Sequence, residues 1–137
     1  MKSATISCAN EMQPPMAAVR QSTAKGRAVY ALTNIPSHAV IMQSQAILLD
    51  AKDYEKLGET GIWPYRFAVG DQCAFVFGDI AFCNHSDTPN AAITWTQLTP
   101  TTAIANLIAL SDIKANAEIE ILYADTEEYS RRGVILS

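Results

Sequence analysis

The sequence predicts a mainly β domain with short helices and many loops. The apolar residues occur in short runs interrupted by turn residues, a pattern typical of strands joined by tight connections. These runs are rich in Ile, Val, Thr and aromatic residues, which favour a pleated, half-buried backbone. Clear helix signals occur at only two places, and the length of 137 residues fits one domain.

The expected strands are short apolar or alternating segments between polar turn residues. Gln43-Ser44-Gln45 separates two of them and is short enough to connect a hairpin. The strands are expected over residues 27–32, 39–42, 46–49, 74–77, 91–96, 104–110 and 119–123.

Two short helices are expected, each with its own end signals. Asp50 can cap a helix over residues 51–57, and Gly58 can end this helix in the left-handed conformation. Asp125-Thr126-Glu127-Glu128 resembles a capping box, and Gly133 would end the helix that it starts.

Composition and charge argue against several classes of function. Pro14-Pro15 separates an N-terminal leader, residues 1–15, from a single domain over residues 16–137. No run of Lys or Arg occurs, so direct nucleic acid binding is not expected, whereas a net charge of −4 suits a basic protein partner. No apolar stretch is long enough for a membrane span or a signal peptide, which predicts a cytoplasmic protein that does not bind membranes.

The cysteines and histidines do not suggest a metal site. The three cysteines, Cys8, Cys73 and Cys83, contain no Cys-x-x-Cys pair, so neither a disulfide framework nor structural zinc is expected. The two histidines, His38 and His85, add too few ligands for a metal centre. No metal is therefore expected, and a reducing compartment fits best.

Residues 82–90, Phe-Cys-Asn-His-Ser-Asp-Thr-Pro-Asn, form the most unusual segment. These residue types favour neither helix nor strand, and they predict a structured loop whose side chains bond to the backbone. Alternatives are a plain polar turn or, in a secreted protein, an N-glycosylation acceptor at Asn84. A hydrolase with His85 as general base and Cys83 or Ser86 as nucleophile is a further alternative, although no Gly-x-Ser-x-Gly turn accompanies it.

The same loop resembles the signature of SET-domain protein lysine methyltransferases. Asn84-His85-Ser86-x-x-Pro89-Asn90 matches the family's Asn-His-Ser-x-x-Pro-Asn at every specified position. Residues 109–123 resemble the second signature, Ala-Leu-x-Asp-Ile-x-x-Gly-Glu-Glu-Leu-x-x-x-Tyr, and residues 25–31 resemble the Gly-x-Gly-Val-Phe-Ala start. The three pieces occur in the family's order, and the length resembles the small stand-alone SET proteins of viruses and bacteria.

The resemblance implies both a fold and an activity. The fold would be the SET-domain (β-clip) fold, with several short sheets, short helices and a C-terminal segment threaded in a pseudoknot. The activity would be transfer of a methyl group from S-adenosylmethionine to a lysine ε-amine in a histone-like or other basic protein tail. The residues expected to hold the cofactor are Lys25, Gly26, Arg27, Ala28, Asn84, His85 and Tyr129.

Tyr123 falls on the family's catalytic tyrosine, whose hydroxyl orients the lysine amine. Tyr65 and Ile121 are expected to line the substrate channel with Tyr123, whereas Trp63 fits the channel or the core. Ile121 stands where Phe or Tyr commonly limits methylation, so its smaller side chain predicts room for two or three methyl groups. His85 is expected to act through its backbone and its packing rather than as a base.

Three residues depart from the family's pattern. Ala28 replaces the second Gly of the first signature, which would cost about 1 kcal/mol if this position needed a positive φ. Asn116 replaces a Gly but tolerates the left-handed region, and Ala117 replaces one of two paired acidic residues. The departures keep open an alternative, a catalytically weak S-adenosylmethionine-binding module that recognises lysine-containing tails. Such a small core also has the option of forming a homodimer to complete its channel.

Overall fold

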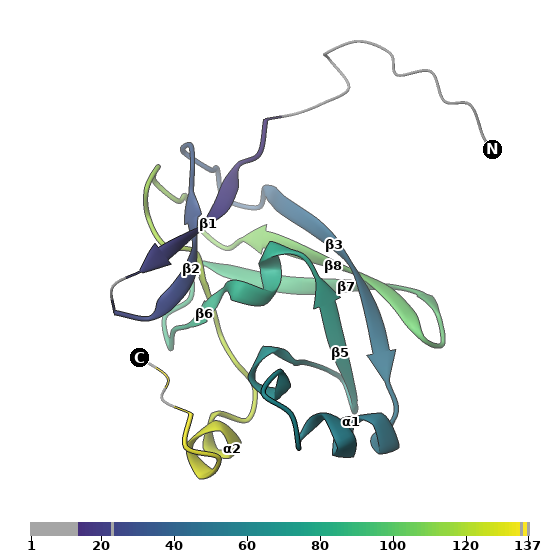
Figure 1. Cartoon of the computed structure of the whole chain (residues 1–137). Coiled ribbons are helices and arrows are strands. Elements are labelled where there is room, and N and C mark those ends of the chain that lie inside the picture. Colours follow the sequence, from purple (N-terminus) through teal and green to yellow (C-terminus); the bar gives the residue numbers. More distant parts are fainter. Residues whose placement is uncertain (1–13, 23, 135, 137) are drawn as a thin grey trace, which may run out of the picture.

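The strands form three sheets, as the computed structural model of residues 14–22, 24–134 and 136 shows (Figure 1). Strands β1 (Ala17–Ser22) and β2 (Gly26–Ala31) form an antiparallel hairpin. A five-stranded antiparallel sheet has the order β4-β5-β3-β8-β7. The mainly β prediction is confirmed, and residues 1–13 of the expected leader lie outside the described residues. The larger sheet comprises β3 (Val40–Leu49), β4 (Phe67–Val69), β5 (Gln72–Phe77), β7 (Ala91–Thr99) and β8 (Thr102–Ala109).

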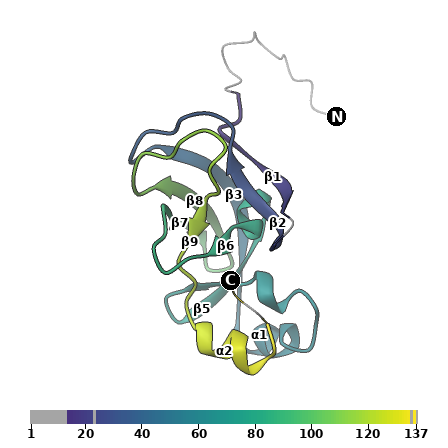
Figure 2. The ribbon, with the colours of Figure 1, turned by 90° about the vertical axis from the view of Figure 1, so that its left-hand side faces the viewer.

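The core lies between the β1–β2 hairpin and one face of the larger sheet (Figure 2). Alternate residues of β8 point into it, and Ala105 and Leu107 are fully buried. Two 3-10 helices complete the packing, η2 (Trp63–Tyr65) and η3 (Asp79–Phe82), and Ile80 of η3 is also fully buried. Among the described residues, no helix is long and apolar enough to cross a membrane.

Strand β3 is continuous, so the prediction of two strands joined by a hairpin at residues 43–45 was wrong. Gln43 and Gln45 are exposed, whereas Ala46 is buried, which is the alternation of a strand with one uncovered face. Gln43 also donates a hydrogen bond of 2.7 Å from Nε2 to Asn106 Oδ1 on β8. The polar residues therefore mark the outer face of the sheet and not a break in the strand.

Helix α1 (Ala51–Leu57) begins as predicted but ends differently. The backbone N–H of Asp53 donates to Asp50 Oδ1 over 2.8 Å, so Asp50 is the expected cap. Gly58 has a φ of −61°, and the predicted left-handed ending was wrong. An added Cβ at Gly58 would lie 3.0 Å from Arg132 Nη2, so this glycine permits a close approach of the C-terminal segment.

Helix α2 (Thr126–Arg131) is present, and Gly133 follows it with a φ of 76°. The expected capping box was wrong, because Asp125 has a φ of 54° and its side chain accepts no capping hydrogen bond. The Glu128 carboxylate, which would complete that box, instead pairs with Arg131 and Arg132. Helix α2 lies close to α1 at one end of the molecule (Figure 1).

The loop after Cys83 holds the C-terminal segment of the domain. Strand β6 (Asn84–His85) pairs in parallel with β9 (Glu120–Ile121), a shorter strand than the one expected over residues 119–123. Beyond this pair, the N–H of Ser86 donates to Ile121 O over 2.9 Å, and the N–H of Asn90 donates to Glu120 O over 3.2 Å. The loop thus bonds the passing segment along its length, as expected for a threaded C-terminal segment.

Candidate active site

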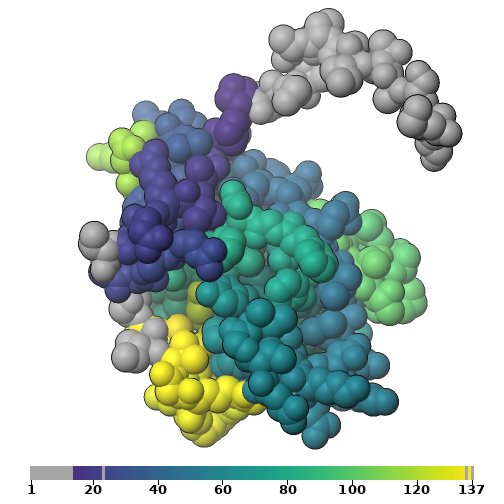
Figure 3. Space-filling model, in the orientation of Figure 1, coloured from purple at the N-terminus to yellow at the C-terminus, as the bar shows by residue number. Residues whose placement is uncertain are grey.

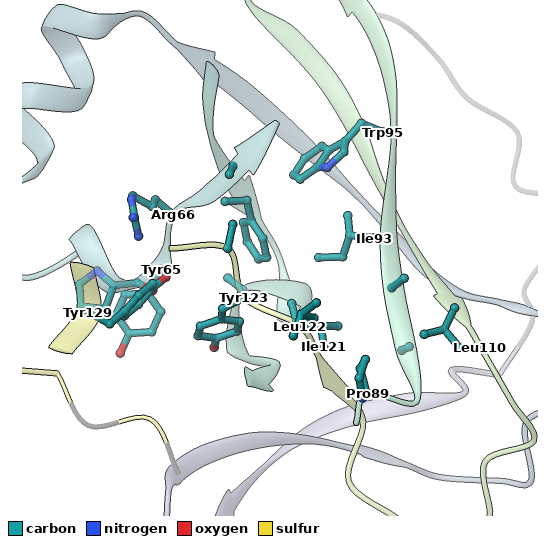
Figure 4. A pocket seen from close by; sticks show the side chains of 17 residues that line it. Tyr65, Arg66, Pro89, Ile93, Trp95, Leu110, Ile121, Leu122, Tyr123 and Tyr129 are labelled. Atoms are coloured by element: carbon teal, nitrogen blue, oxygen red, sulfur yellow. The ribbon is translucent and has the colours of Figure 1, made fainter. Parts of the chain in front are cut away.

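Two cavities meet at a shared wall in the middle of the molecule. The first, with a volume of about 320 Å³, is called here the apolar groove, and Figure 4 shows its lining. The second, with a volume of about 350 Å³, is called the polar cavity. Both are lined by Pro64, Tyr65, Ala81, Tyr123 and Tyr129. Three tyrosines therefore separate one hollow from the other.

The polar cavity collects most of the residues predicted to hold a cofactor. Ala28 is an exception, because its methyl group is fully buried within β2, where it pairs with Arg20. His85 is the other exception and lines a neighbouring open hollow, which also includes Lys25. The predicted residues that line the polar cavity are Lys25, Gly26, Arg27, Asn84 and Tyr129.

The structure gives the backbone conformation at three positions of the signatures. Gly26 has a φ of +75°, and an added Cβ would meet no atom within 4 Å, so the backbone here faces open space. Asn116 has a φ of 71°, so Asn adopts the left-handed turn as expected. Ala28 has no positive φ, so the conditional penalty at that position does not arise.

A charged network at the polar cavity was missed from the sequence. Lys25 Nζ lies 2.9 Å from Glu120 Oε2 and 3.6 Å from Glu118 Oε1. The hydrogen bond with Glu120 raises the pKa of Lys25, so the ammonium stays charged. Asn84 Nδ2 donates to Glu118 Oε2 over 3.1 Å, which connects the loop to the same network. No local pattern links Lys25 with carboxylates so distant in sequence.

Tyr123 is held at both its backbone and its hydroxyl group. Its N–H donates to His85 Nδ1 over 3.0 Å, and its hydroxyl donates to the carbonyl oxygen of Cys83 over 2.5 Å. The other ring nitrogen of His85 lies 2.9 Å from Asp87 Oδ1. Burial raises the pKa of Tyr123 well above its usual range, so the phenol remains protonated. The imidazole therefore positions Tyr123.

The geometry does not support the hydrolase alternative. Cys83 is almost fully buried, and burial raises the pKa of its thiol to about 12, so the thiolate is not available near neutral pH. Ser86 Oγ accepts the backbone N–H of Thr88 over 3.1 Å and thereby stabilises its own turn. Neither side chain forms a hydrogen bond with His85 in the described structure, so neither nucleophile has a base.

The aromatic residues of the wall have different environments. Tyr129 is buried, its hydroxyl donates to Pro64 O over 3.1 Å, and its ring centroid lies 5.4 Å from that of Tyr123. Tyr65 is half-buried and packs edge-on against Phe82 at 5.9 Å. Trp63 is a core residue outside both cavities, with the guanidinium carbons of Arg66 and Arg132 at 3.8 and 4.2 Å from the ring centroid.

The apolar groove contains residues that were not predicted as site residues. Ile121, predicted for the substrate channel, lines it, and Arg66 is the only charged lining residue in the described part of the chain. The groove continues away from Tyr123 along β7 (Figure 4). The additional apolar lining residues there are Phe67, Pro89, Ala91, Ala92, Ile93, Trp95, Leu110 and Leu122.

Comparisons with known proteins agree with this arrangement. A family model described as the SET domain matches residues 26–124, a range that contains β2, the loop at residues 84–90 and Tyr123. A crystal structure from Plasmodium falciparum, described as a "putative histone methyltransferase", is similar in fold with a TM-score of 0.67. It is 19% identical in sequence, and the match covers 83% of this chain and 97% of that chain. No curated protein matches the sequence.

Proposed function

The chain belongs to the SET-domain family, and we propose on that premise that it transfers methyl groups from S-adenosylmethionine to the ε-amine of a lysine in a protein substrate. The observation that supports this proposal most strongly is the meeting of two cavities at the wall that contains Tyr123. A methyl donor in the polar cavity and a lysine in the apolar groove would face each other across this wall. That arrangement suits an in-line displacement, in which alignment supplies much of the rate.

The lining of the polar cavity fits this cofactor. Gly26 leaves backbone exposed to the cavity, which allows a ligand to approach closely. The Lys25 ammonium and the Asn84 amide offer polar groups to the amino-acid end of the cofactor. When bound, S-adenosylmethionine supplies a methyl group activated by a positively charged sulfonium.

Tyr123 would orient the lysine amine. Its hydroxyl gives its proton to Cys83 O, so the lone pairs of the phenolic oxygen are left to accept an N–H from the substrate. The tyrosine rings of the wall favour a cationic or partly cationic nitrogen. A desolvated channel also lowers the pKa of the incoming lysine, which helps to produce the neutral amine required for attack.

The small side chain of Ile121 favours addition of more than one methyl group. It is buried and lines the apolar groove beside Tyr123. An aliphatic side chain leaves more room around the amine than Phe or Tyr would. Mass spectrometry of a good substrate should therefore show di- or trimethyllysine, and a product that stays monomethylated at long times would refute this part of the proposal.

Methyl transfer to an array of lysine-containing peptides tests the proposal. With labelled S-adenosylmethionine, label should enter a subset of the peptides and should be absent from the same peptides with Lys→Arg replacements. Because the amine is the acceptor, an Arg peptide cannot replace the Lys peptide. Label that is independent of lysine would contradict the proposed acceptor.

A further inference from the structure

The apolar groove extends well beyond the wall at which a lysine would react. Tyr123 and Tyr129 lie at one end, and Ile93, Trp95 and Leu110 lie toward the other (Figure 4). The groove is therefore continuous with the proposed transfer site, and its natural occupant is the polypeptide that carries the lysine. Residues next to the lysine must then pack against the far end.

The far end offers apolar surface without an opposite charge for a basic side chain. Leu110 is 48% exposed although it lines the groove, and Ile93 and Trp95 are half-buried. Among the described residues, no carboxylate lines the groove, and the one charged lining residue, Arg66, is positive. A Lys or Arg side chain placed there would lose water without gaining a partner, whereas a large apolar side chain would gain burial.

Arg66 lies at the other end of the groove, next to Tyr65 and Tyr129 (Figure 4). Its guanidinium carbon lies 3.8 Å from the centroid of Trp63 and 5.0 Å from that of Tyr129, and its Nε donates to Tyr54 Oη over 3.3 Å. Among the described residues, no carboxylate forms an ion pair with it. Its positive charge therefore acts at this end of the groove, where it disfavours the protonated form of the incoming lysine.

We propose that the groove selects a substrate in which a large apolar residue lies beside the target lysine, at the position that packs against Ile93 and Leu110. This inference rests on the proposed function, because it assumes that the lysine enters at Tyr123. It narrows the expected substrates from basic tails in general to segments with an apolar neighbour of the lysine. Leu110 is then a specificity-determining residue that takes no part in the transfer itself.

The test compares peptides that contain a single lysine. The residue beside this lysine is Leu, Ser or Arg in turn. Binding is measured by fluorescence anisotropy with S-adenosylhomocysteine present, and methyl transfer is measured separately with S-adenosylmethionine. When the varied residue lies on the side of the lysine that faces the far end of the groove, the Leu peptide should bind and react about tenfold better than the Arg peptide. This is the gain expected for burial of one aliphatic side chain.

Two matched variants locate the preference. Leu110→Glu places a carboxylate in the groove and should abolish or reverse the preference for Leu over Arg. Leu98→Glu is the control, because Leu98 is similarly exposed, at 53%, but does not line the groove. It should leave the preference unchanged, and thermal unfolding of both variants checks that they fold.

The outcomes separate this inference from the proposed function. Equal binding of Leu and Arg peptides to the unmodified protein would overturn the inference, as would identical effects of Leu110→Glu and Leu98→Glu. Methyl transfer without any preference would leave the proposed function intact and remove the inference alone. A binding preference without methyl transfer would support the inference and contradict the proposed function.

Discussion

The hydroxyl and the backbone N–H of Tyr123 are fixed by the same short segment of chain. Cys83 supplies the carbonyl oxygen for the hydroxyl, and His85 supplies Nδ1 for the backbone N–H. The segment from Cys83 to His85 therefore determines where the phenolic oxygen of Tyr123 points. The sequence predicted that His85 acts through its backbone and its packing, whereas in the structure its imidazole accepts the N–H of Tyr123.

At Ala28, the structure predicts that the family's second glycine is not needed. Ala28 is fully buried in β2 and has no positive φ. Ala28→Gly should lower the free energy of unfolding by about 1–2 kcal/mol, because it removes a buried methyl group and adds freedom to the unfolded chain. Urea denaturation measures this loss.

Affinity for S-adenosylmethionine, measured by calorimetry, should be unchanged in Ala28→Gly, because Ala28 does not line the polar cavity. The control is Gly26→Ala, which adds a Cβ at a φ of +75° beside that cavity and should weaken cofactor binding. Clearly tighter binding by Ala28→Gly would show that the alanine impairs the site.

The side chain of Asn90 bonds to backbone groups around the start of strand β9 in the way that a neighbouring strand would. Its Nδ2 donates to Glu118 O and its Oδ1 accepts the N–H of Glu120, each over 2.9 Å. Only Glu120–Ile121 of the expected strand lies in a ladder. The N–H of Ile119 instead donates to Val29 O, and the N–H of Tyr123 donates to the His85 side chain. Local residue preferences do not encode such bonds, which explains the overestimated strand.

Asn90→Ala should lower the free energy of unfolding by about 2–3 kcal/mol, because two backbone groups lose their partners. It should also reduce kcat, since the segment that carries Tyr123 is released. Chemical denaturation and steady-state kinetics measure the two effects. Asn34→Ala is the control, because Asn34 Oδ1 accepts one backbone N–H, that of Ala115, and lines neither cavity at the wall.

The control variant should lose less stability and keep its kcat. Equal kcat values for Asn90→Ala and the unmodified protein would contradict the proposed connection between the loop and Tyr123.

Other elements show what a local pattern can predict. The start of α1 was correct because Asp50 and the N–H that it caps are three residues apart. The end of α1 was wrong because Gly58 lies against Arg132, which is distant in sequence. The polar residues of β3 were mistaken for a turn because one face of its sheet is uncovered, which sequence alternation in one strand cannot reveal.

At the scale of the whole molecule, the C-terminal segment closes the site from one side. Helix α2 packs against the segment around α1 and η2 (Figure 3). Arg132 lies over Trp63 and its Nη1 donates to Gly58 O over 2.7 Å. This contact brings Tyr129 into the wall and Val134 to the polar cavity. Gly58 and Trp63 are distant in sequence from Arg132, so the closure was expected only from the resemblance.

Arg132→Ala should loosen this closure and weaken cofactor binding several-fold, since Val134 and Leu136 line the polar cavity. Hydrogen exchange of α2 and calorimetric titration with S-adenosylmethionine measure the two effects. Arg131→Ala is the matched control, because Arg131 is 66% exposed and pairs only with Glu128 among the described residues. Unchanged exchange and affinity in Arg132→Ala would show that the contact with Trp63 does not hold the segment.

We claim that the shared wall supports methyl transfer and not only binding, and the Tyr123→Phe variant distinguishes the two. Cofactor affinity by calorimetry and single-turnover methylation of one lysine peptide should be measured on both proteins. We expect transfer by the unmodified protein, similar cofactor affinity in both, and a fall in the rate of at least about a hundredfold in Tyr123→Phe. An unmodified protein that binds cofactor and peptide without turnover, or a Tyr123→Phe variant with the full rate, would contradict the claim.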